Sequence, residues 1–233
     1  DLANQTARRL AQQAELAEQA LEAARIGLEL EREVLSGTVR LTCSDAVLHG
    51  LLLPALARFM PGYPALQLEL ATSNDFANLS RRDADIALRM TRTPPEHLVG
   101  RNLGEVRYVL CASERYLEGR DATEPAMLHW IAPDDFLPDH PSVVWRRRHY
   151  PGVLPAYRCN GVLAVAEMAR AGLGLAAIPA YLLRDGDGLR VLDADLEGCA
   201  SALWLLTRPD CRALRSVVAL FDELGRHVRL GDE

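Results

Sequence analysis

Polar side chains follow three predicted strands in the first half of the chain. Ser44 and Asp45 come after the alternating segment 38–42, Ser73, Asn74 and Asp75 come after 66–70, and Arg89 ends the segment 85–89. In parallel α/β sheets, ligands bind beyond the carboxyl ends of the strands, where turns lead into helix N-termini. Free N–H groups and partial positive charge at such turns favour an anion or a carboxylate. These turns therefore predict a small-ligand site at one edge of a sheet.

Two carboxylates complicate this site. If Asp45 and Asp75 point inward, they repel an anionic ligand unless Arg89 or Arg92 offsets them, or unless the ligand is cationic or amphoteric. A second interpretation makes Ser44 and Ser73 simple helix N-caps, each worth about 1 kcal/mol, with the aspartates stabilised by the helix dipole. The capping and binding roles are compatible, so both stay open.

The elements that position these turns alternate between strand and helix. The pattern predicts strands at 38–42, 66–70 and 85–89, with a helix at 47–60 that carries Pro54 and a short helix at 76–82 between them. This order predicts a parallel sheet with right-handed crossovers. Further strands are predicted at 106–112, 130–132, 143–145, 175–179, 189–192 and 202–207, and helices at 162–171 and 212–228.

Residues 1–35 predict a long helix, because they contain no Pro or aromatic residue and are rich in Ala, Leu, Glu, Gln and Arg. Small and apolar residues recur at heptad spacing, which predicts a dimerisation seam through Leu10, Ala14, Ala17, Leu21, Ala24 and Leu28. The alternative is a single amphipathic helix that packs on its own domain.

Composition excludes several classes of protein. The 233 residues carry a net charge of -6, which argues against a general polyanion binder, and no apolar run reaches the roughly 20 residues of a membrane span. Five scattered cysteines fit a reducing, cytoplasmic compartment, and no secretory signal is recognisable. No catalytic motif, metal-ligand spacing or cofactor fingerprint is present, so no enzyme activity, metal or cofactor is predicted. The start at Asp1 suggests a fragment.

Several motifs together resemble the regulatory part of LysR-type transcriptional regulators. They are the long first helix, Gly37-x-Val39-Arg40-Leu41, Leu52-Leu53-Pro54-x-Leu56-x-x-Phe59 with Tyr63-Pro64, Leu68-Glu69-Leu70, Asp85 to Arg89, Leu103-Gly104-Glu105, Cys111-Ala112-Ser113 with Tyr116-Leu117, and Gly172 to Pro179. The resemblance covers essentially the whole chain. Each motif alone is weak, but their order and spacing are specific.

The resemblance implies an α/β fold of two Rossmann-like lobes, as in type 2 periplasmic binding proteins, joined by two crossover strands. By this analogy residues 1–35 are the linker helix for dimerisation, 37–107 with 208–233 form lobe I, and 108–207 form lobe II. The crossings would fall near 108–111 and 203–207. A small-molecule inducer would bind between the lobes of a homodimer or homotetramer. The winged helix-turn-helix of the family is missing, so DNA would be bound only by a domain absent from this chain.

The same analogy adds second-lobe residues to the site. Pro133 and Asp134 follow a predicted strand and would face the cleft, although an acidic surface turn is an equal alternative. Asn160 precedes the helix at 162–171, where it could cap that helix and reach a ligand. The triplet Arg146–Arg148 is interpreted as a solvated basic loop rather than as a nucleic-acid surface.

Other functions are weighed against the regulator. A solute-binding protein of a transport system shares the lobed fold, but it predicts a secretory signal and gives no reason for a heptad arm. Redox sensing through Cys43 or Cys111 stays open as a minor alternative, because some relatives sense oxidants through cysteines.

Overall fold

The computed structural model of this chain describes residues 17, 35–73 and 84–231. These residues form a mixed sheet in the order β2-β1-β3-β9-β4-β7-β5-β6, with β8 paired to β4. The strands are β1 (Gly37–Cys43), β2 (Leu66–Thr72), β3 (Ile86–Met90), β4 (Val99–Ser113), β5 (Trp130–Pro133), β6 (Tyr157–Cys159), β7 (Leu175–Pro179), β8 (Leu189–Asp193) and β9 (Ala200–Thr207). The helices are α2 (Asp45–Val47), α3 (Leu53–Phe59), α5 (Glu114–Leu117), α6 (Pro141–His149), α7 (Val162–Arg170) and α8 (Arg215–His227).

The parallel start of the sheet is confirmed. β1 pairs in parallel with β2 on one side and with β3 on the other. Four of the five residues of β3, from Ile86 to Arg89, are buried, which is typical of a central strand covered on both faces. The predicted helix at 47–60 is present, but its middle, Leu48–Leu52, is π-helical and separates α2 from α3.

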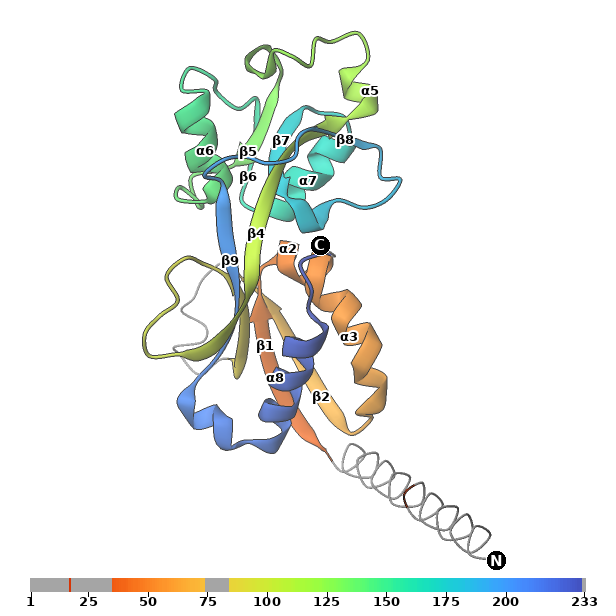
Figure 1. Cartoon of the computed structure of the whole chain (residues 1–233), viewed down its shortest axis with the longest axis vertical. Helices are drawn as coiled ribbons and strands as arrows, with labels where there is room; N and C mark the ends of the chain where they lie inside the picture. Colours follow the sequence, from red (N-terminus) through yellow and green to blue (C-terminus); the bar gives the residue numbers. More distant parts are fainter. Residues whose placement is uncertain (1–16, 18–34, 74–83, 232–233) are drawn as a thin grey trace, which may run out of the picture.

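One long strand connects the two halves of the molecule. The first part of β4, Val99–Arg107, pairs with β9, whereas Tyr108–Ala112 pairs with β7 and Leu110–Ser113 pairs with β8. Figure 1 shows β4 and β9 running together between the part that holds β1, β2, α3 and α8 and the part that holds β5–β7, α6 and α7. The pairing register of β4 shifts between Asn102 and Gly104, and Gly104 has φ +132°, a conformation that favours glycine.

The pairing of β9 bears on the bounds of the predicted lobes. The sequence assigns residues up to 207 to lobe II and expects a crossing at 203–207, but all of Ala200–Thr207 pairs with Val99–Arg107 of β4. Leu203–Thr207 also pairs with β3, so β9 belongs to the first sheet, which is the part of the mixed sheet that contains β1, β2 and β3. Strand β9 nevertheless runs beside β4 between the two parts of the molecule, so the expected crossing at 203–207 stays a prediction. We retain 37–107 with 208–233 as lobe I, add β9 to it, and treat 108–199 as lobe II; this division is a proposal.

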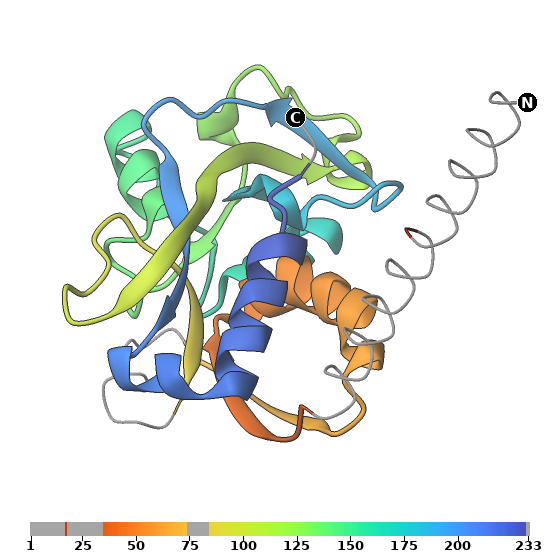
Figure 2. The same ribbon diagram turned by 60° about the horizontal axis from the view of Figure 1, so that its bottom comes forward.

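Helices α3 and α8 lie side by side over the first sheet (Figure 2). Tyr63 donates a hydrogen bond of 2.6 Å to Oε1 of Glu223, which is only 2% exposed. The same carboxylate lies 3.2 Å from Nε2 of His227, on the next turn of α8. A buried carboxylate needs such partners, and these contacts fix α8 against the end of α3.

Helix α6 corrects one prediction. The segment 143–145 was expected to be a strand, but Pro141–His149 is helical. Its buried residues are Ser142, Val143, Trp145 and Arg146, which have helical spacing. Pro141 suits the first turn of a helix, and the basic residues suit the last turn, so the Arg146–Arg148 triplet belongs to a helix and not to a loop. The β-branched and aromatic residues obscured this pattern.

The predicted dimerisation seam lies largely outside the described residues. Leu10, Ala14, Leu21, Ala24 and Leu28 belong to that part, as does the predicted short helix at 76–82. Ala17 is helical and exposed. Pairing through these residues stays a prediction.

Replacing Tyr63 by Phe is expected to destabilise the first lobe. Tyr63→Phe removes the donor to the buried Glu223 carboxylate, and a hydrogen bond to a charged group contributes about 1.5–3 kcal/mol. Urea denaturation measures the free energy of unfolding. Tyr157→Phe on β6, where the side chain is exposed, is the matched control and should change it by less than about 0.5 kcal/mol. Equal effects of the two substitutions would contradict the role of the Tyr63 hydroxyl.

Candidate functional site

A cavity of about 110 Å³ lies where the carboxyl ends of β1 and β3 face lobe II. It is lined by Ser44, Arg89, Met90, Tyr108, Leu137, His140, Pro141, Val162 and Ser201. Lobe I, the crossing strands and lobe II all contribute residues. The cavity therefore lies at the strand-end position that the sequence predicts for a ligand.

The wall from lobe I carries Ser44 and Arg89. Ser44 is the N-cap of α2, and its Oγ accepts a hydrogen bond of 3.3 Å from the backbone N–H of Val47. Arg89 is only 4% exposed; it donates to Oγ1 of Thr42 at 2.8 Å and to the carbonyl of Ser73. These contacts hold a permanently charged guanidinium beside the cavity.

The opposite wall carries a buried histidine. His140 Nδ1 lies 2.8 Å from Oγ of Ser142, and its Nε2 lies 3.4 Å from the hydroxyl of Tyr108. Burial lowers the pKa of His140 to about 4, so its ring is neutral at neutral pH. Burial also raises the pKa of Tyr108 well above its usual value. Both groups therefore offer the cavity hydrogen bonds without charge.

A contact between the lobes lies beside the cavity. A Cβ added to Gly161 would lie 2.8 Å from Oδ2 of Asp45, so the absence of a side chain on Gly161 allows the carboxylate to approach. Gly161 is the N-cap of α7, and α2 contacts α7. A carboxylate beside a helix N-terminus is stabilised by the helix dipole. Asp45 thus connects lobe I to α7 instead of lining the cavity.

The other predicted site residues have different places. Ser73 lies beside the site through its carbonyl contact with Arg89. Pro133 ends β5, and Oδ1 of Asp134 accepts a 3.0 Å hydrogen bond from the N–H of Phe136; neither residue lines the cavity. Asn74 and Asp75 lie outside the described residues. Ligand contact by all these residues stays a prediction.

The predicted helix cap at Asn160 is wrong. Helix α7 begins at Val162, so the cap position falls on Gly161, which has no side chain. Asparagine is a favoured cap residue, but the cap position falls on Gly161, where the lack of a side chain leaves room for the Asp45 carboxylate. Ligand contact by Asn160 stays a prediction.

Sequence reasoning also missed most of the cavity wall. Tyr108 was treated only as part of a strand that crosses between the lobes, Ser201 was not considered, and His140 was considered only as a metal ligand. A signal existed at His140-Pro141, because proline in the first helical position marks a helix N-terminus. The apolar lining residues Met90, Leu137 and Val162 carry no such signal.

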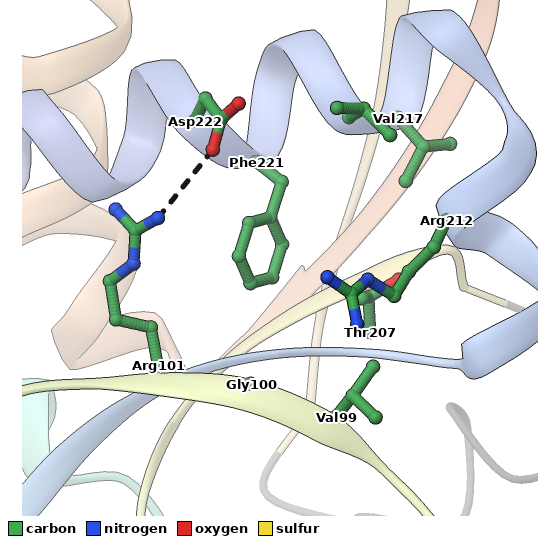
Figure 3. A pocket seen from close by; sticks show the side chains of 9 residues that line it. Val99, Gly100, Arg101, Thr207, Arg212, Val217, Phe221 and Asp222 are labelled. Carbon is green, nitrogen blue, oxygen red and sulfur yellow. Dashed lines mark ion pairs between the residues drawn. The ribbon is translucent and has the colours of Figure 1, made fainter.

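A different hollow lies within lobe I between β4 and α8 (Figure 3). Its volume is about 300 Å³, and the ring of Phe221 points into it from α8. Two of its three charged residues pair with each other, since Arg101 Nη2 lies 3.5 Å from Oδ1 of Asp222. A ligand there would contact lobe I alone, so this hollow is a weaker candidate for a site that responds to the arrangement of the lobes.

A third hollow lies beside the crossing strands, between Leu103–Arg107, the turn at Ala180 and Tyr181, and Arg229–Gly231. It measures about 670 Å³. Its charged residues, Glu105, Arg107 and Arg229, are exposed to solvent, so it lacks the buried polar groups that orient a small ligand.

The cysteines do not have the properties of redox sensors. Burial raises the pKa of the Cys43 thiol to about 11 and those of Cys111 and Cys199 to about 12. Because the thiolate is the reactive form, these thiols are inert at neutral pH. All five cysteines are free thiols.

The described residues contain no group of three or more His, Cys, Asp or Glu side chains arranged to hold a metal ion. In the same part of the chain, no helix combines the length and apolar character that crossing a membrane requires.

The chain matches a protein-family model, several known proteins and several solved structures. A family model described as "LysR substrate binding domain" matches residues 32–229. The Mau operon transcriptional activator of Paracoccus denitrificans is 29% identical, over 88% of this chain and 70% of that protein. A probable HTH-type transcriptional regulator, LtrA of Klebsiella pneumoniae, is 26% identical, over 91% of this chain and 74% of that protein. The solved regulatory domain of CrgA from Neisseria meningitidis superposes with a TM-score of 0.71 at 20% identity, covering 83% of this chain and 100% of that one.

Acid is expected to destabilise the fold through His140. The pKa of His140 is about 4 in the folded chain and 6.5 for an ordinary histidine, so the unfolded chain takes up a proton first as pH falls. The stability from this group is complete above about pH 6.5 and is lost toward about pH 4, by up to about 3 kcal/mol. The measurement is the free energy of unfolding in urea between pH 7.5 and pH 4.5.

Two variants isolate this effect. His140→Gln should have a flatter dependence of stability on pH, because the titrating ring is gone. His97→Gln, at an exposed position, should keep the slope of the unmodified chain. If both variants keep that slope, the acid sensitivity has another source.

Proposed function

The chain belongs to the family of LysR-type transcriptional regulators, and we propose that the cavity between its lobes binds the small-molecule effector of the regulator. Residues 32–229 are the regulatory, effector-binding domain of such a protein. The family consists of transcriptional regulators and not of enzymes. The comparisons support this assignment over a solute-binding protein of a transport system.

The composition of the cavity wall carries the proposal. Ser44 and Arg89 come from lobe I, and His140 and Val162 come from lobe II, so a bound molecule would contact both lobes at once. Such a ligand would favour the arrangement of lobes in which all its contacts form. Strands β4 and β9, which run between the lobes, would transmit this change.

A tyrosine connects the cavity to a second contact between the lobes. Tyr181, in the turn after β7, lies so close to Gly50 of lobe I that a Cβ there would be 2.5 Å from its Cδ2 atom. The hydroxyl of Tyr181 donates to Sδ of Met90 at 3.6 Å, and Met90 lines the cavity. An effector that displaces Met90 would therefore also act on the packing of Tyr181 against Gly50.

We assign DNA binding to a domain outside these 233 residues. The relatives include HTH-type regulators, and this chain covers 70% and 74% of the first two of them. Pairing of the 1–35 segment would form a homodimer or homotetramer, through which the effector would control transcription in the cytoplasm.

The effector site is tested by screening small metabolites for an increase in thermal unfolding temperature. Ser44→Ala and Arg89→Ala should both reduce the shift caused by a true effector, because both residues line the cavity. Arg190→Ala, at an exposed position on β8, is the control and should leave it unchanged. A compound whose shift survives both cavity substitutions would disprove this location of the site.

The contact between the lobes is tested by Gly50→Ala. The added methyl group would overlap the Tyr181 ring, so we expect a loss of about 1–3 kcal/mol in unfolding free energy and a change in small-angle scattering as the lobes shift. Gly62→Ala, where a Cβ has nothing within 4 Å, is the matched control. In a Tyr181→Ala background the Gly50→Ala loss should be smaller; additive losses would contradict a direct contact.

A further inference from the structure

We propose that the effector is a small monocarboxylate with a short aliphatic chain, close to butyrate in size. This inference rests on the proposed function, since it names the chemical class of molecule for the same cavity.

The charge of the cavity wall favours a ligand that carries one negative charge. Among the described residues that line the cavity, Arg89 carries the charge at neutral pH, because His140 and Tyr108 are held neutral by burial. The guanidinium is 4% exposed, so its interaction with an anion in the cavity is weakly screened by solvent.

The two helices of lobe II add to this preference. Pro141 and Val162 are the first residues of α6 and α7, and both line the cavity. Each helix has nine residues, and neither has a side-chain cap at its N-terminus. The dipoles of these helices favour an anionic group on this side, but Pro141 has no N–H to donate and the Asp45 carboxylate already lies against the start of α7.

The nearby carboxylate limits the ligand to one negative charge. Asp45 adjoins Ser44, which lines the cavity, and lies against Gly161 at the start of α7. Its negative charge opposes part of the field from Arg89 and α7, so a second charge on the ligand would be repelled. A dicarboxylate or a phosphate fits this balance less well than a monocarboxylate.

The apolar lining residues and the volume of the cavity indicate the uncharged part of the ligand. Met90, Leu137, Pro141 and Val162 form the apolar wall of a cavity of about 110 Å³. An apolar cavity of about 150 Å³ accepts benzene, so this one fits about four to six non-hydrogen atoms. Butyrate has this size and joins a carboxylate to an aliphatic chain.

Isothermal titration of the whole chain at pH 7.5 tests the proposal with sodium butyrate, butyramide, succinate, benzoate and butylamine. We expect butyrate to bind at least tenfold more tightly than butyramide, its uncharged equivalent, and more tightly than the dianion, the aromatic acid or the amine. Equal binding of butyrate and butyramide, or preferred binding of butylamine or succinate, would overturn the inference.

Two substitutions locate the ligand within the cavity. Met90→Ala enlarges the cavity on its apolar side and should change the preferred acid from butyrate to hexanoate. Met127→Ala, which shortens an exposed methionine, is the control and should leave the preferred acid unchanged. Asp45→Asn should strengthen butyrate binding several-fold and leave butyramide unchanged. Butyrate binding that none of these substitutions alters would place the acid elsewhere and overturn the inference.

The outcomes separate this inference from the proposed function. If no carboxylate binds, but a compound of another class binds and is lost in Ser44→Ala, the cavity is the effector site and the monocarboxylate assignment is wrong. If bound compounds are insensitive to Ser44→Ala, Arg89→Ala and Met90→Ala alike, the cavity assignment itself fails.

Discussion

The exchange of partners along β4 is the constraint on which the rest of the structure depends. A single strand pairs with β9 over Val99–Arg107 and with β7 and β8 beyond it, so both halves of the molecule share one strand. Because backbone hydrogen bonds fix the register on each side, a change in the angle between the lobes must bend β4 near Arg107 and Tyr108, where its partners change. The cavity lies beside this region and is therefore sensitive to that angle.

The buried guanidinium of Arg89 is the second group around which the structure is organised. A charge this well shielded must be hydrogen-bonded, and Thr42 and Ser73 supply the contacts from the ends of β1 and β2. The parallel pairing of β1 with β2 and β3 brings these residues to the same edge of the sheet. The topology thus assembles a cationic wall from three segments that are separate in sequence.

The sequence predicted what depends on local pattern. Alternation located the strands of lobe I, and two of the polar residues predicted at their ends, Ser44 and Arg89, line the cavity. It failed where distant partners decide, since α6 is a helix despite strand-forming residues. His140 was missed for the same reason, since only burial by segments distant in sequence makes it a neutral ring facing a cavity.

The π-helical segment at Leu48–Leu52 has a consequence for how this chain can vary. A π-turn contains one more residue than an α-helical turn, and Gly50 within it receives the ring of Tyr181. Loss of one residue here would restore a regular helix and leave α3 facing nearly the same way, because the π-turn takes up its extra residue within one turn. A related chain without this residue would therefore keep the packing of α3 on α8 and change the contact between Gly50 and Tyr181.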